Sequence, residues 1–526
     1  MTFSCRRVSA VWLAAMLGPL LWGAQGPLVQ KQKPIPISAE RQLFIDDAMV
    51  EARFNVVRVM HRPTKTAEPV LTGDRPWENW TIYLFGSPSI HFDQATGLYR
   101  MWYTSCDVPV DHYFINYATS KDGVNWTKPI LGIEDFKGSK ENNIVNQGRV
   151  FWINSTVILD ERETNPDRRY KSLSWDFATA SGPEIVPPGH YRPSGGAEYK
   201  KGRPLGVSVA FSRDGLHWTP YAGNPVLKNT GDTHSVLGWD DKHQKYVGYF
   251  RPSYAASGGI RVIGFSTSDD FINWTPPEII LKPDTEDPIS DEFYDMPVVK
   301  YQGKYIGFLW MYHNSPHPAL VRSPALDNEK GSQQTLDTQL TYSHDGKQFI
   351  RVGDRQPFLP IGSPGAWDQG WATVSDMIIR DQEIWLYYSG WGARHNNDQE
   401  QMGKIVNGRR IMAAIGLAKL RLDGFVSLRA GEGEGIVQLR QVLLRDQKYL
   451  RINADASEGR LDVELLDEQL VPIPGFTRAD FETWRQNFVS KAISWRGQRD
   501  LSSLQGRAVR VRIHMQNTDL YSVQFN

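Results

Sequence analysis

The stretch FSRDGLHWTP, from Phe211 to Pro220, has three similar copies elsewhere in the chain. They are ATSKDGVNWTKP before it, FSTSDDFINWTPP after it and YSHDGKQFIRV further on. Each copy lies between two stretches that alternate like β-strands, and Asp-Gly commonly forms the tight turn of a hairpin. The repeat therefore predicts a structural turn, in which the aspartate accepts hydrogen bonds from turn amides and the tryptophan packs between neighbouring sheets.

Each copy closes a unit of four predicted antiparallel strands. In the first unit these are SPSIHFD (Ser87–Asp93), LYRMWYTS, YFINYATS and VNWTKPI. Four further units open at STVILDERETNPDRRYKSLSWDF, SVLGWDDKHQKYVGYFRP, MPVVKYQGKYIGFLWMYH and VSDMIIRDQEIWLYYSGWG, and IGLAKLRLDGFVSL closes the last with a degenerate turn. Tandem four-stranded units are typical of a β-propeller. We predict five blades over residues 80–430, each with its first strand lining a central channel.

The flanking segments extend this all-β prediction. After the Gly/Glu linker RAGEGEGI, residues 431–526 alternate apolar and polar positions, which predicts a C-terminal β-sandwich. Residues 25–79 form an N-terminal arm, whose strand RQLFIDDAMVE (Arg41–Glu51) either closes the ring or packs elsewhere. The second unit carries a Gly/Pro-rich insertion around Gly182–Lys200, which predicts a loop.

The composition narrows the possible partners. Lys+Arg and Asp+Glu both number 59, so a net charge of zero does not support a nucleic-acid or anionic-membrane partner. Of the two cysteines, Cys5 lies in the N-terminal segment and Cys106 stands alone, without the ligand spacing of a zinc site. We therefore expect neither a metal nor a cofactor. The sequence leaves the oligomeric state open.

Residues 1–24 have the pattern of a signal peptide. Arg6 and Arg7 precede an apolar run from Val8 to about Leu21, followed by small residues. This pattern predicts a secreted or periplasmic protein with no further membrane association. An uncleaved anchor is the alternative, although the run is short for a transmembrane helix.

Five blades, a signal peptide and a trailing β-sandwich resemble the glycoside hydrolases of families 32 and 43. The stretch EFYD (Glu292–Asp295) keeps the Glu-x-x-Asp spacing of a family 32 motif, whereas GSPSI places Ser87 where family 43 has an acid. The resemblance implies a divergent enzyme that cleaves terminal furanosides or pyranosides from oligo- or polysaccharides with paired carboxylates. A carbohydrate-binding propeller without catalysis and a glycoside phosphorylase or sialidase on the same scaffold remain open.

Acids at the mouths of the inner strands are the candidate catalytic groups, because only these strands converge on the axis. They are Asp232, Glu292, Asp295, Asp376 and, before the first inner strand, Glu78. We predict that Asp232 and Glu292 face each other across one mouth, with Asp376 close by. For each of these residues, a turn-capping, loop or core role is the alternative. Candidate sugar-binding residues are Trp77, Trp80, His234, Arg251, Trp310, His313, Trp391, Arg394 and His395.

Overall fold

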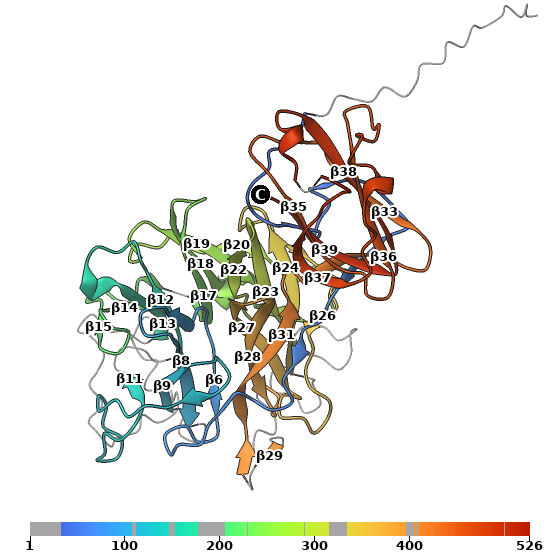
Figure 1. Ribbon diagram of the computed structural model, residues 1–526. Coiled ribbons are helices and arrows are strands. Elements are labelled where there is room, and N and C mark those ends of the chain that lie inside the picture. The colour runs from blue at the N-terminus through green and yellow to red at the C-terminus, as the bar shows by residue number, and fades with distance from the viewer. Residues whose placement is uncertain are drawn as a thin grey trace, which may run out of the picture.

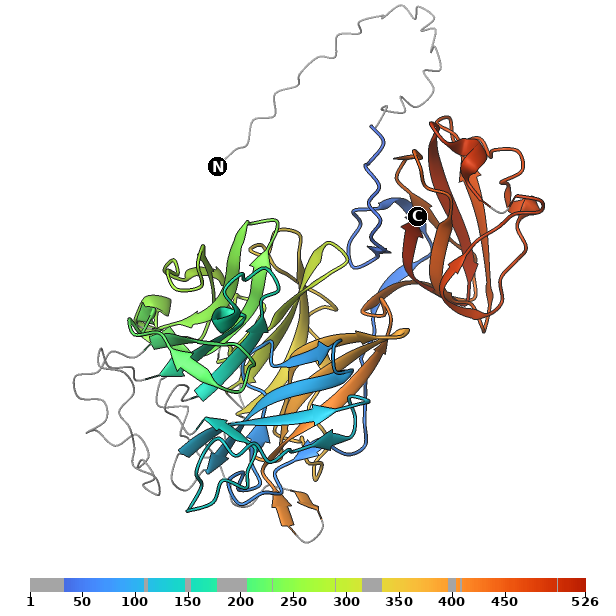
Figure 2. The ribbon, with the colours of Figure 1, turned by 60° about the vertical axis from the view of Figure 1, so that its left-hand side comes forward.

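The computed structural model describes residues 33–107, 112–146, 153–176, 206–228, 230–288, 290–314, 334–395, 404–406, 409–498 and 500–526. The predicted signal peptide and the insertion at Gly182–Lys200 lie outside these residues. The described chain consists mainly of β-strands and forms a propeller with a β-sandwich beside it (Figure 1 and Figure 2). The predicted all-β fold is therefore confirmed. Among the described residues, no helix has the length and apolar character needed to span a bilayer.

Blades one to three are separate antiparallel sheets, and neighbouring blades pack through their first strands. A short helix, α1 (Tyr254–Ser257), lies between β18 and β19, and a 3-10 turn, η2 (Pro166–Arg168), lies between β12 and β13. The strands of blade one are β6 (Ile82–Tyr83), β7 (Ile90–Asp93), β8 (Leu98–Asp107), β9 (His112–Ser120), β10 (Trp126–Thr127) and β11 (Ile144–Asn146). Those of blade two are β12 (Ile153–Leu159), β13 (Tyr170–Asp176), β14 (Gly206–Ser212), β15 (Trp218–Pro220) and β16 (Leu227–Lys228). Those of blade three are β17 (Thr230–Asp240), β18 (Lys245–Pro252), β19 (Ile263–Ser268) and β20 (Glu278–Leu281).

Blades four and five form one continuous sheet, because a parallel bridge joins Leu336 of one to Trp371 of the other. The strands of blade four are β21 (Glu292–Phe293), β22 (Val298–Tyr301), β23 (Lys304–His313), β24 (Thr335–Ser343), β25 (Ile350–Arg351) and β26 (Pro357–Leu359). Those of blade five are β27 (Trp371–Arg380), β28 (Glu383–Trp391), β31 (Ala413–Arg421), β4 (Thr64–Lys65) and β5 (Leu71–Thr72), and β29 (Lys404–Val406) pairs with β30 (Arg409–Ile411) beside it.

The two ends of the chain meet in the sandwich and in the last blade. The outer strand of blade five comes from the N-terminal arm, since β4 and β5 pair with β31. The predicted strand at Arg41–Glu51 does not close the ring, because β1 (Gln42–Leu43) and β2 (Val50–Phe54) pair with C-terminal strands. The strand β32 (Val426–Ala430), which we assigned to the propeller, also pairs in the sandwich. The sandwich thus begins before residue 431 and includes the first part of the N-terminal arm, from β1 to β3 (Val57–Met60).

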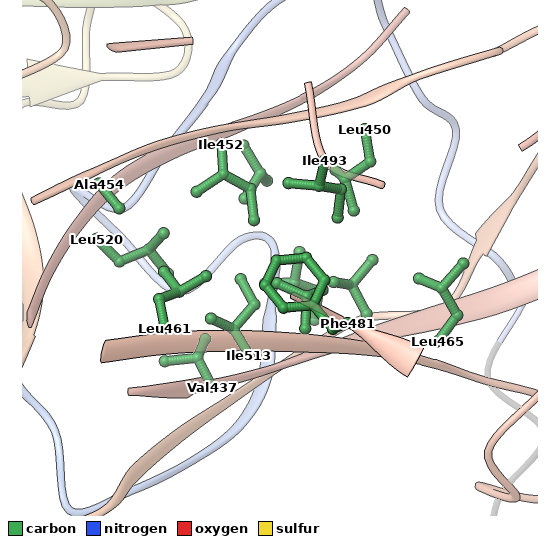
Figure 3. Packing of buried hydrophobic residues seen from close by; sticks show 14 of the residues in the cluster. Val437, Leu450, Ile452, Ala454, Leu461, Leu465, Phe481, Ile493, Ile513 and Leu520 are labelled. Atoms are coloured by element: carbon green, nitrogen blue, oxygen red, sulfur yellow. The ribbon is translucent and has the colours of Figure 1, made fainter. Parts of the chain in front are cut away.

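The sandwich encloses a hydrophobic core between two sheets. Figure 3 shows side chains such as Ile452 and Leu520 of one sheet facing Leu461 and Ile513 of the other. The 3-10 turns η4 (Arg478–Asp480) and η5 (Ser502–Leu504) lie in its loops. One sheet contains β1, β3 (Val57–Met60), β32, β39 (Thr518–Phe525), β35 (Leu450–Asp455) and β37 (Asn487–Ala492). The other contains β2, β33 (Gly435–Leu439), β38 (Ala508–Gln516), β34 (Val442–Leu443) and β36 (Arg460–Leu466).

Strand pairing defines two ends of the propeller. In blade five, Trp371 pairs with Trp391, and Trp391 pairs with Ala413, so the start of the inner strand and the β28–β31 connection share one end. We call this the mouth end. Glu383 pairs with Arg421 at the opposite end, which we call the turn end because it carries the repeated Ser-x-Asp-Gly turns.

Each repeated turn is held by its own aspartate, as the sequence predicted. In blade two, Asp214 Oδ1 accepts hydrogen bonds from the amides of Leu216 and His217, both at 2.8 Å, and Trp218 Nε1 donates to the carbonyl of Gly215 at 3.0 Å. Gly215 has a φ of 79°, and a Cβ there would lie 2.7 Å from Trp102 of blade one. The turn therefore requires glycine for its backbone and for its contact with the neighbouring blade.

The same turns also join neighbouring blades. A cationic side chain from the preceding blade donates to a backbone carbonyl of the turn, and in three blades an aromatic side chain donates to the carbonyl of its glycine. The cation contacts are Arg100 to Asp214, Arg168 to Asp270, Lys242 to His344 and Arg380 to Asp122. The aromatic contacts are Trp102 to Gly215, Tyr249 to Gly346 and Tyr387 to Gly123. The repeat thus holds the ring together as well as reversing the chain.

Asp423, in the degenerate turn of blade five, connects the propeller to the sandwich. Its side chain is fully buried and forms an ion pair with Arg41 at 2.8 Å. It also accepts from the Tyr301 hydroxyl of blade four at 2.5 Å and from the Ser522 hydroxyl of the sandwich at 2.6 Å. One carboxylate therefore links two blades, the N-terminal arm and the C-terminal sheet.

The segment Gly86–Ser89 of blade one lies across the propeller axis, because it bonds to blades two, three and five. The bonds run from Val157 N–H to Pro88 O at 2.7 Å, from Val236 N–H to Ser87 O at 2.7 Å, and from Ser89 N–H to the Asp376 oxygens at 3.2 and 3.1 Å. Ser87 thus contributes its backbone carbonyl to the contact between blades one and three.

Candidate functional site

Side chains from blades three, four and five meet at the mouth end. The register of the β17–β18 hairpin pairs Thr230 with Pro252, which places Asp232 beside Arg251, and the two form an ion pair. In the β18–β19 connection, Arg261 Nη1 donates to Glu292 Oε2 at 2.6 Å. Two carboxylate–arginine pairs therefore border the mouth.

Tyr294 lies between the two arginines. Their guanidinium carbons are 5.2 and 5.3 Å from the centroid of its ring for Arg251 and Arg261, respectively. The Tyr294 hydroxyl interacts with Arg251 and lies 3.1 Å from His395 Nε2. Because a guanidinium can only donate, the hydroxyl accepts from Arg251; when it also donates to Nε2, the proton of a neutral His395 is on Nδ1.

Aromatic rings form one wall of the mouth. The ring of His395 stacks on Trp371, with centroids 5.4 Å apart and an interplanar angle of 9°. The ring centroid of Trp391 lies 4.9 Å from that of Trp371 and 5.3 Å from that of Tyr83. Such faces suit the apolar side of a sugar ring, and they also exclude water from the polar groups beside them.

The mouth has a positive electrostatic potential at His395. Burial, together with the charges of Arg261 and Arg251, lowers the pKa of His395 to about 3. Burial and the nearby Arg261 also lower the pKa of Arg251. His395 is therefore neutral near pH 7, while Asp232 and Glu292 pair with the two arginines.

Several buried donors at the mouth have no hydrogen-bond partner among the described residues. They are Arg251 Nη1, Trp371 Nε1, Trp391 Nε1 and His395 Nδ1. An unsatisfied buried donor costs about 1–3 kcal/mol, so these groups are candidates for hydrogen bonds to the acceptor oxygens of a ligand.

His313 lies at the same end of blade four, between two acids. Its Nδ1 is 2.7 Å from Asp291 and its Nε2 is 2.9 Å from Asp337. Burial alone would lower its pKa, but Asp337 and Asp291 outweigh that effect and raise the pKa of His313 to about 10. His313 is therefore a fixed cation that holds the ends of three segments of blade four.

Asp295 and Asp376 lie deeper, on the inner strands. Burial raises the pKa of Asp295 to about 7, against weaker effects of the Met296 amide, the Ser235 hydroxyl and Arg251. Burial likewise raises the pKa of Asp376 to about 7, opposed by the Ser89 amide. Both acids are therefore partly protonated near neutral pH. Asp295 is near the Asp232–Arg251 pair, whereas Asp376 holds the segment that crosses the axis.

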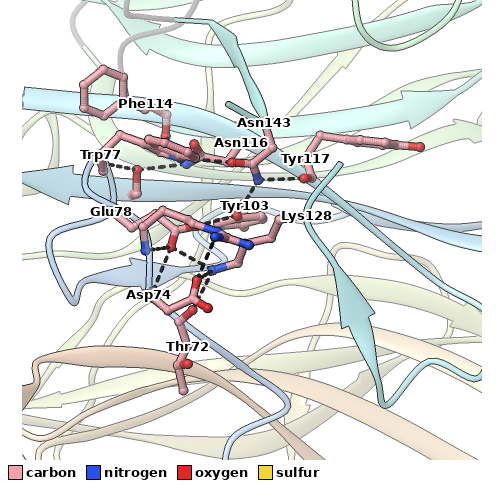
Figure 4. Close-up of polar contacts among 12 residues, drawn as sticks. Thr72, Asp74, Trp77, Glu78, Tyr103, Phe114, Asn116, Tyr117, Lys128 and Asn143 are labelled. Carbon is pink, nitrogen blue, oxygen red and sulfur yellow. Dashed lines mark hydrogen bonds and ion pairs between the residues drawn. The ribbon is translucent and has the colours of Figure 1, made fainter. Parts of the chain in front are cut away.

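Glu78 belongs to a separate polar cluster in blade one (Figure 4). Its Oε1 accepts from the Tyr103 hydroxyl at 2.6 Å, and its Oε2 accepts from Lys128 at 2.7 Å and from the amides of Asp74 and Arg75 at 2.9 Å. Burial raises the pKa of Glu78, although Lys128 opposes it. These contacts use both oxygens of Glu78 to fix the loop before β6.

The other predicted residues differ in how close they lie to the mouth. Trp77 donates to Asn143 at 2.9 Å in the cluster around Glu78, and Trp80 follows it in a left-handed backbone conformation. His234 is buried, with Nε2 3.1 Å from the carbonyl of Leu173, and burial lowers its pKa to about 4. Trp310 is buried and donates to Val374 at 2.7 Å, while the half-buried Arg394 directly precedes His395.

Sequence reasoning missed Arg261, Tyr294 and Trp371. Tyr294 lies inside the quoted EFYD motif, and Trp371 begins the fifth inner strand, so both had a positional signal. Arg261 had none, because the length of the β18–β19 connection does not show where its end returns. Sequence reasoning also missed the two acids that flank His313, for the same reason; they are Asp291 and Asp337.

A groove of about 740 Å³ lies away from the mouth, between the N-terminal arm and blades three and four. It contains none of the predicted site residues, and its charged groups are largely paired, as in the contact of Arg355 with Asp284 at 2.7 Å. Within the described ranges, no three His, Cys, Asp or Glu side chains are placed to hold a metal ion. The mouth remains the site at which unsatisfied polar groups collect.

Comparisons with known proteins give similarity at the level of the fold. No protein-family model and no curated protein matches this sequence. Among solved structures, a glycosyl hydrolase from Bacteroides ovatus is 15% identical with a TM-score of 0.42, over 73% of this chain and 97% of its own. The Bombyx mori GH32 beta-fructofuranosidase is 12% identical with a TM-score of 0.39, over 87% of this chain and 94% of its own.

A third structure comes from the GH130 family of mannoside phosphorylases, described as containing glycoside hydrolases that target beta-1,2 mannosidic linkages in Candida mannan. It is 14% identical with a TM-score of 0.41, over 69% of this chain and 94% of its own. All three structures are described as glycoside-active proteins. At these identities the likeness concerns the fold and does not extend to the reaction or the substrate.

Proposed function

We propose that this chain is a glycoside hydrolase that cleaves terminal sugars from oligo- or polysaccharides at the mouth end of the propeller. The observation that carries this proposal is the convergence of the Asp232–Arg251 and Glu292–Arg261 pairs with an aromatic wall and unsatisfied donors. Glycoside cleavage requires acids beside a sugar-binding surface, and the mouth supplies both.

The acids have different environments, which suits different roles. Asp232 has 31% of its side chain exposed and is held as an ion pair, so we assign it to the base or nucleophile. Asp295, with its pKa raised to about 7 by burial, matches the need for a general acid that is protonated near neutral pH. Glu292, paired with Arg261, is the second candidate for either role.

The test is turnover on a panel of aryl-glycosides and of plant and algal oligosaccharides. We expect Asp232→Asn, Glu292→Gln and Asp295→Asn each to reduce kcat by about 100-fold or more, without a change in fold. Asp241→Asn is the matched control, because Asp241 is an exposed acid at the turn end of the same β17–β18 hairpin. Variants that all retain full activity would exclude this site.

Inorganic phosphate separates two outcomes of the same assay. Cleavage that needs no phosphate and yields a free sugar is the expected result. A phosphate-dependent product that is a sugar phosphate would identify a phosphorylase. Sugar binding without cleavage of any substrate would instead identify a carbohydrate-binding propeller.

We also propose that the chain is exported, since its first 24 residues have the pattern of a signal peptide. Expression in a bacterial host should give a periplasmic or secreted protein whose N-terminal sequence begins near Gln25. Recovery of that exported fraction with Met1 intact would indicate an uncleaved anchor.

A further inference from the structure

Around Tyr294 the groups left unsatisfied by the described residues include several nitrogen donors, whereas Asn314 Oδ1 and Asp337 Oδ1, beside His313, are unsatisfied acceptors at the same end. Arg251 Nη1 and the indole N–H groups of Trp371 and Trp391 can only donate, and they have no partner among the described residues. His395 Nδ1 also carries a proton when Tyr294 donates to Nε2. A sugar hydroxyl that accepts hydrogen bonds from these four groups must donate its own proton to another acceptor. An oxyanion, in contrast, only accepts hydrogen bonds.

The charges of the two arginines also favour a ligand with a negative charge. Arg251 and Arg261 both face Tyr294, and their charges help to lower the pKa of His395. Each arginine has a carboxylate partner, but Arg251 contacts Asp232 through Nη2, while its Nη1 lies on the unsatisfied side. A ligand with a negative charge would therefore relieve both the missing hydrogen bonds and the repulsion between the guanidinium groups.

We propose that the cluster of Arg251, Arg261, Tyr294, Trp371, Trp391 and His395, which we call the arginine–aromatic cluster, binds a carboxylate of the substrate, so that the enzyme acts on oligosaccharides of uronic acids. This inference rests on the proposed function and names its substrate class. The carboxylate lies against the Arg251 guanidinium and the N–H groups of His395 and the tryptophans, and the sugar ring packs on the aromatic wall. Asp232 and Glu292, each paired with one of the two arginines, border this cluster.

The test uses a matched pair of ligands that differ only in the carboxylate. Oligogalacturonides, oligomannuronates and oligoglucuronates are each compared with the same oligosaccharide after its carboxyl groups are reduced to primary alcohols. Isothermal titration calorimetry of the full chain measures both affinities. We expect at least one acidic oligosaccharide to bind about tenfold or more tightly than its reduced form, as charge-assisted hydrogen bonds imply.

Variants in the arginine–aromatic cluster should remove the preference for the acidic form selectively. Arg251→Gln should bring the acidic and reduced forms to similar affinities. Trp391→Phe, which keeps a ring but removes one N–H, should reduce the preference about fivefold. Arg213→Gln, an exposed arginine at the turn end, is the control and should leave the preference unchanged. If Arg251→Gln does not fold, Trp391→Phe carries the same test.

The outcomes distinguish this inference from the proposed function. Equal binding and cleavage of reduced, neutral oligosaccharides would overturn the acidic substrate but leave the hydrolase standing. Binding of inorganic phosphate with no binding of any acidic oligosaccharide would overturn it in favour of a free anion. A preference for acidic ligands that persists in both Arg251→Gln and Trp391→Phe would show that another surface binds the carboxylate.

Discussion

The polar groups at the two ends of the propeller differ in how far the protein satisfies their hydrogen bonds. At the turn end, burial acts to raise the pKa of Asp214, but the amides of His217 and Leu216 outweigh it and lower that pKa to about 2. At the mouth end, His395 is held neutral and Arg251 keeps a donor without a partner among the described residues. The protein's own amides therefore satisfy the repeated aspartates of the turn end, whereas several buried donors of the mouth end have no partner among the described residues. Stability and function are thus expected to separate along the propeller axis.

The largest expected effect tests the junction at the turn end. Arg41→Met leaves the buried Asp423 without its cation, and we expect the free energy of unfolding to fall by about 3–5 kcal/mol. Denaturant unfolding measures it. Arg53→Met is the control in the same arm, since its contact with Asp47 is long, at 3.8 Å, and both side chains are exposed. Equal losses in the two variants would contradict a special role for the buried pair.

The second prediction concerns Asp376, on the axis between the two ends. Its folded pKa of about 7 lies above the unfolded value of about 3.9, so the folded chain keeps a proton that the unfolded chain releases. Its stabilising contribution is therefore full below about pH 4 and is lost as the pH rises through about 7. Asp376→Asn should flatten this dependence by up to about 1.4 kcal/mol per pH unit.

Denaturant unfolding at several pH values between about 4.5 and 7.5 checks this difference. Asp381→Asn, an exposed acid at the turn after the same strand, should follow the wild type. Parallel curves for the wild type and Asp376→Asn would show that the carboxyl group of Asp376 has no raised pKa.

A smaller effect is expected at a single repeated turn. Asp214→Ala removes the acceptor for two amides, and we expect a loss of about 1–2 kcal/mol in the free energy of unfolding, with activity retained. Glu161→Ala, an exposed acid at the same end of blade two, should change stability by less than about 0.5 kcal/mol. A loss of activity in the folded Asp214→Ala protein would contradict the expectation that the turn end contributes to stability and the mouth end to function.

The smallest stability effect is expected at the mouth. In the double variant Asp232→Asn and Arg251→Met the ion pair is removed as a unit, so no charge is left alone and stability should change by less than about 1 kcal/mol. Turnover on any cleaved glycoside should nevertheless be lost. A loss of stability above about 3 kcal/mol would mean that this pair is structural, like the pair at Asp423.

Local sequence predicted the blades well but did not predict the partner of every strand. The residues 426–430 alternate like the outer strand of a fifth blade, yet β32 pairs with β39 in the sandwich, and β4 and β5 take that place from the other end of the chain. Alternation shows which face of a strand is buried, and it does not show which strand lies beside it. A strand separated from its partner by hundreds of residues leaves no local signal.

The site shows the same limit. Asp232 and Arg251 were both predicted, and one hairpin places them side by side. Glu78 was also predicted, because two tryptophans flank it, but its carboxylate contacts Tyr103 and Lys128, which are 25 and 50 residues away. Arg261 reaches the mouth only because the connection after β18 folds back toward blade four, where it meets Glu292.

Local patterns in the chain predicted the repeated turns, the four-stranded units and the all-β class, because these depend on hydrogen bonds and side-chain alternation within a few residues. Three features appear only in the folded molecule: the turns join the blades, Asp423 ties the sandwich to the ring, and Arg251, Tyr294 and His395 come together at one end. Closing a ring brings together residues that are distant in the chain, and the physical reason for their contact, shared burial at one end of the axis, exists only after the ring has closed.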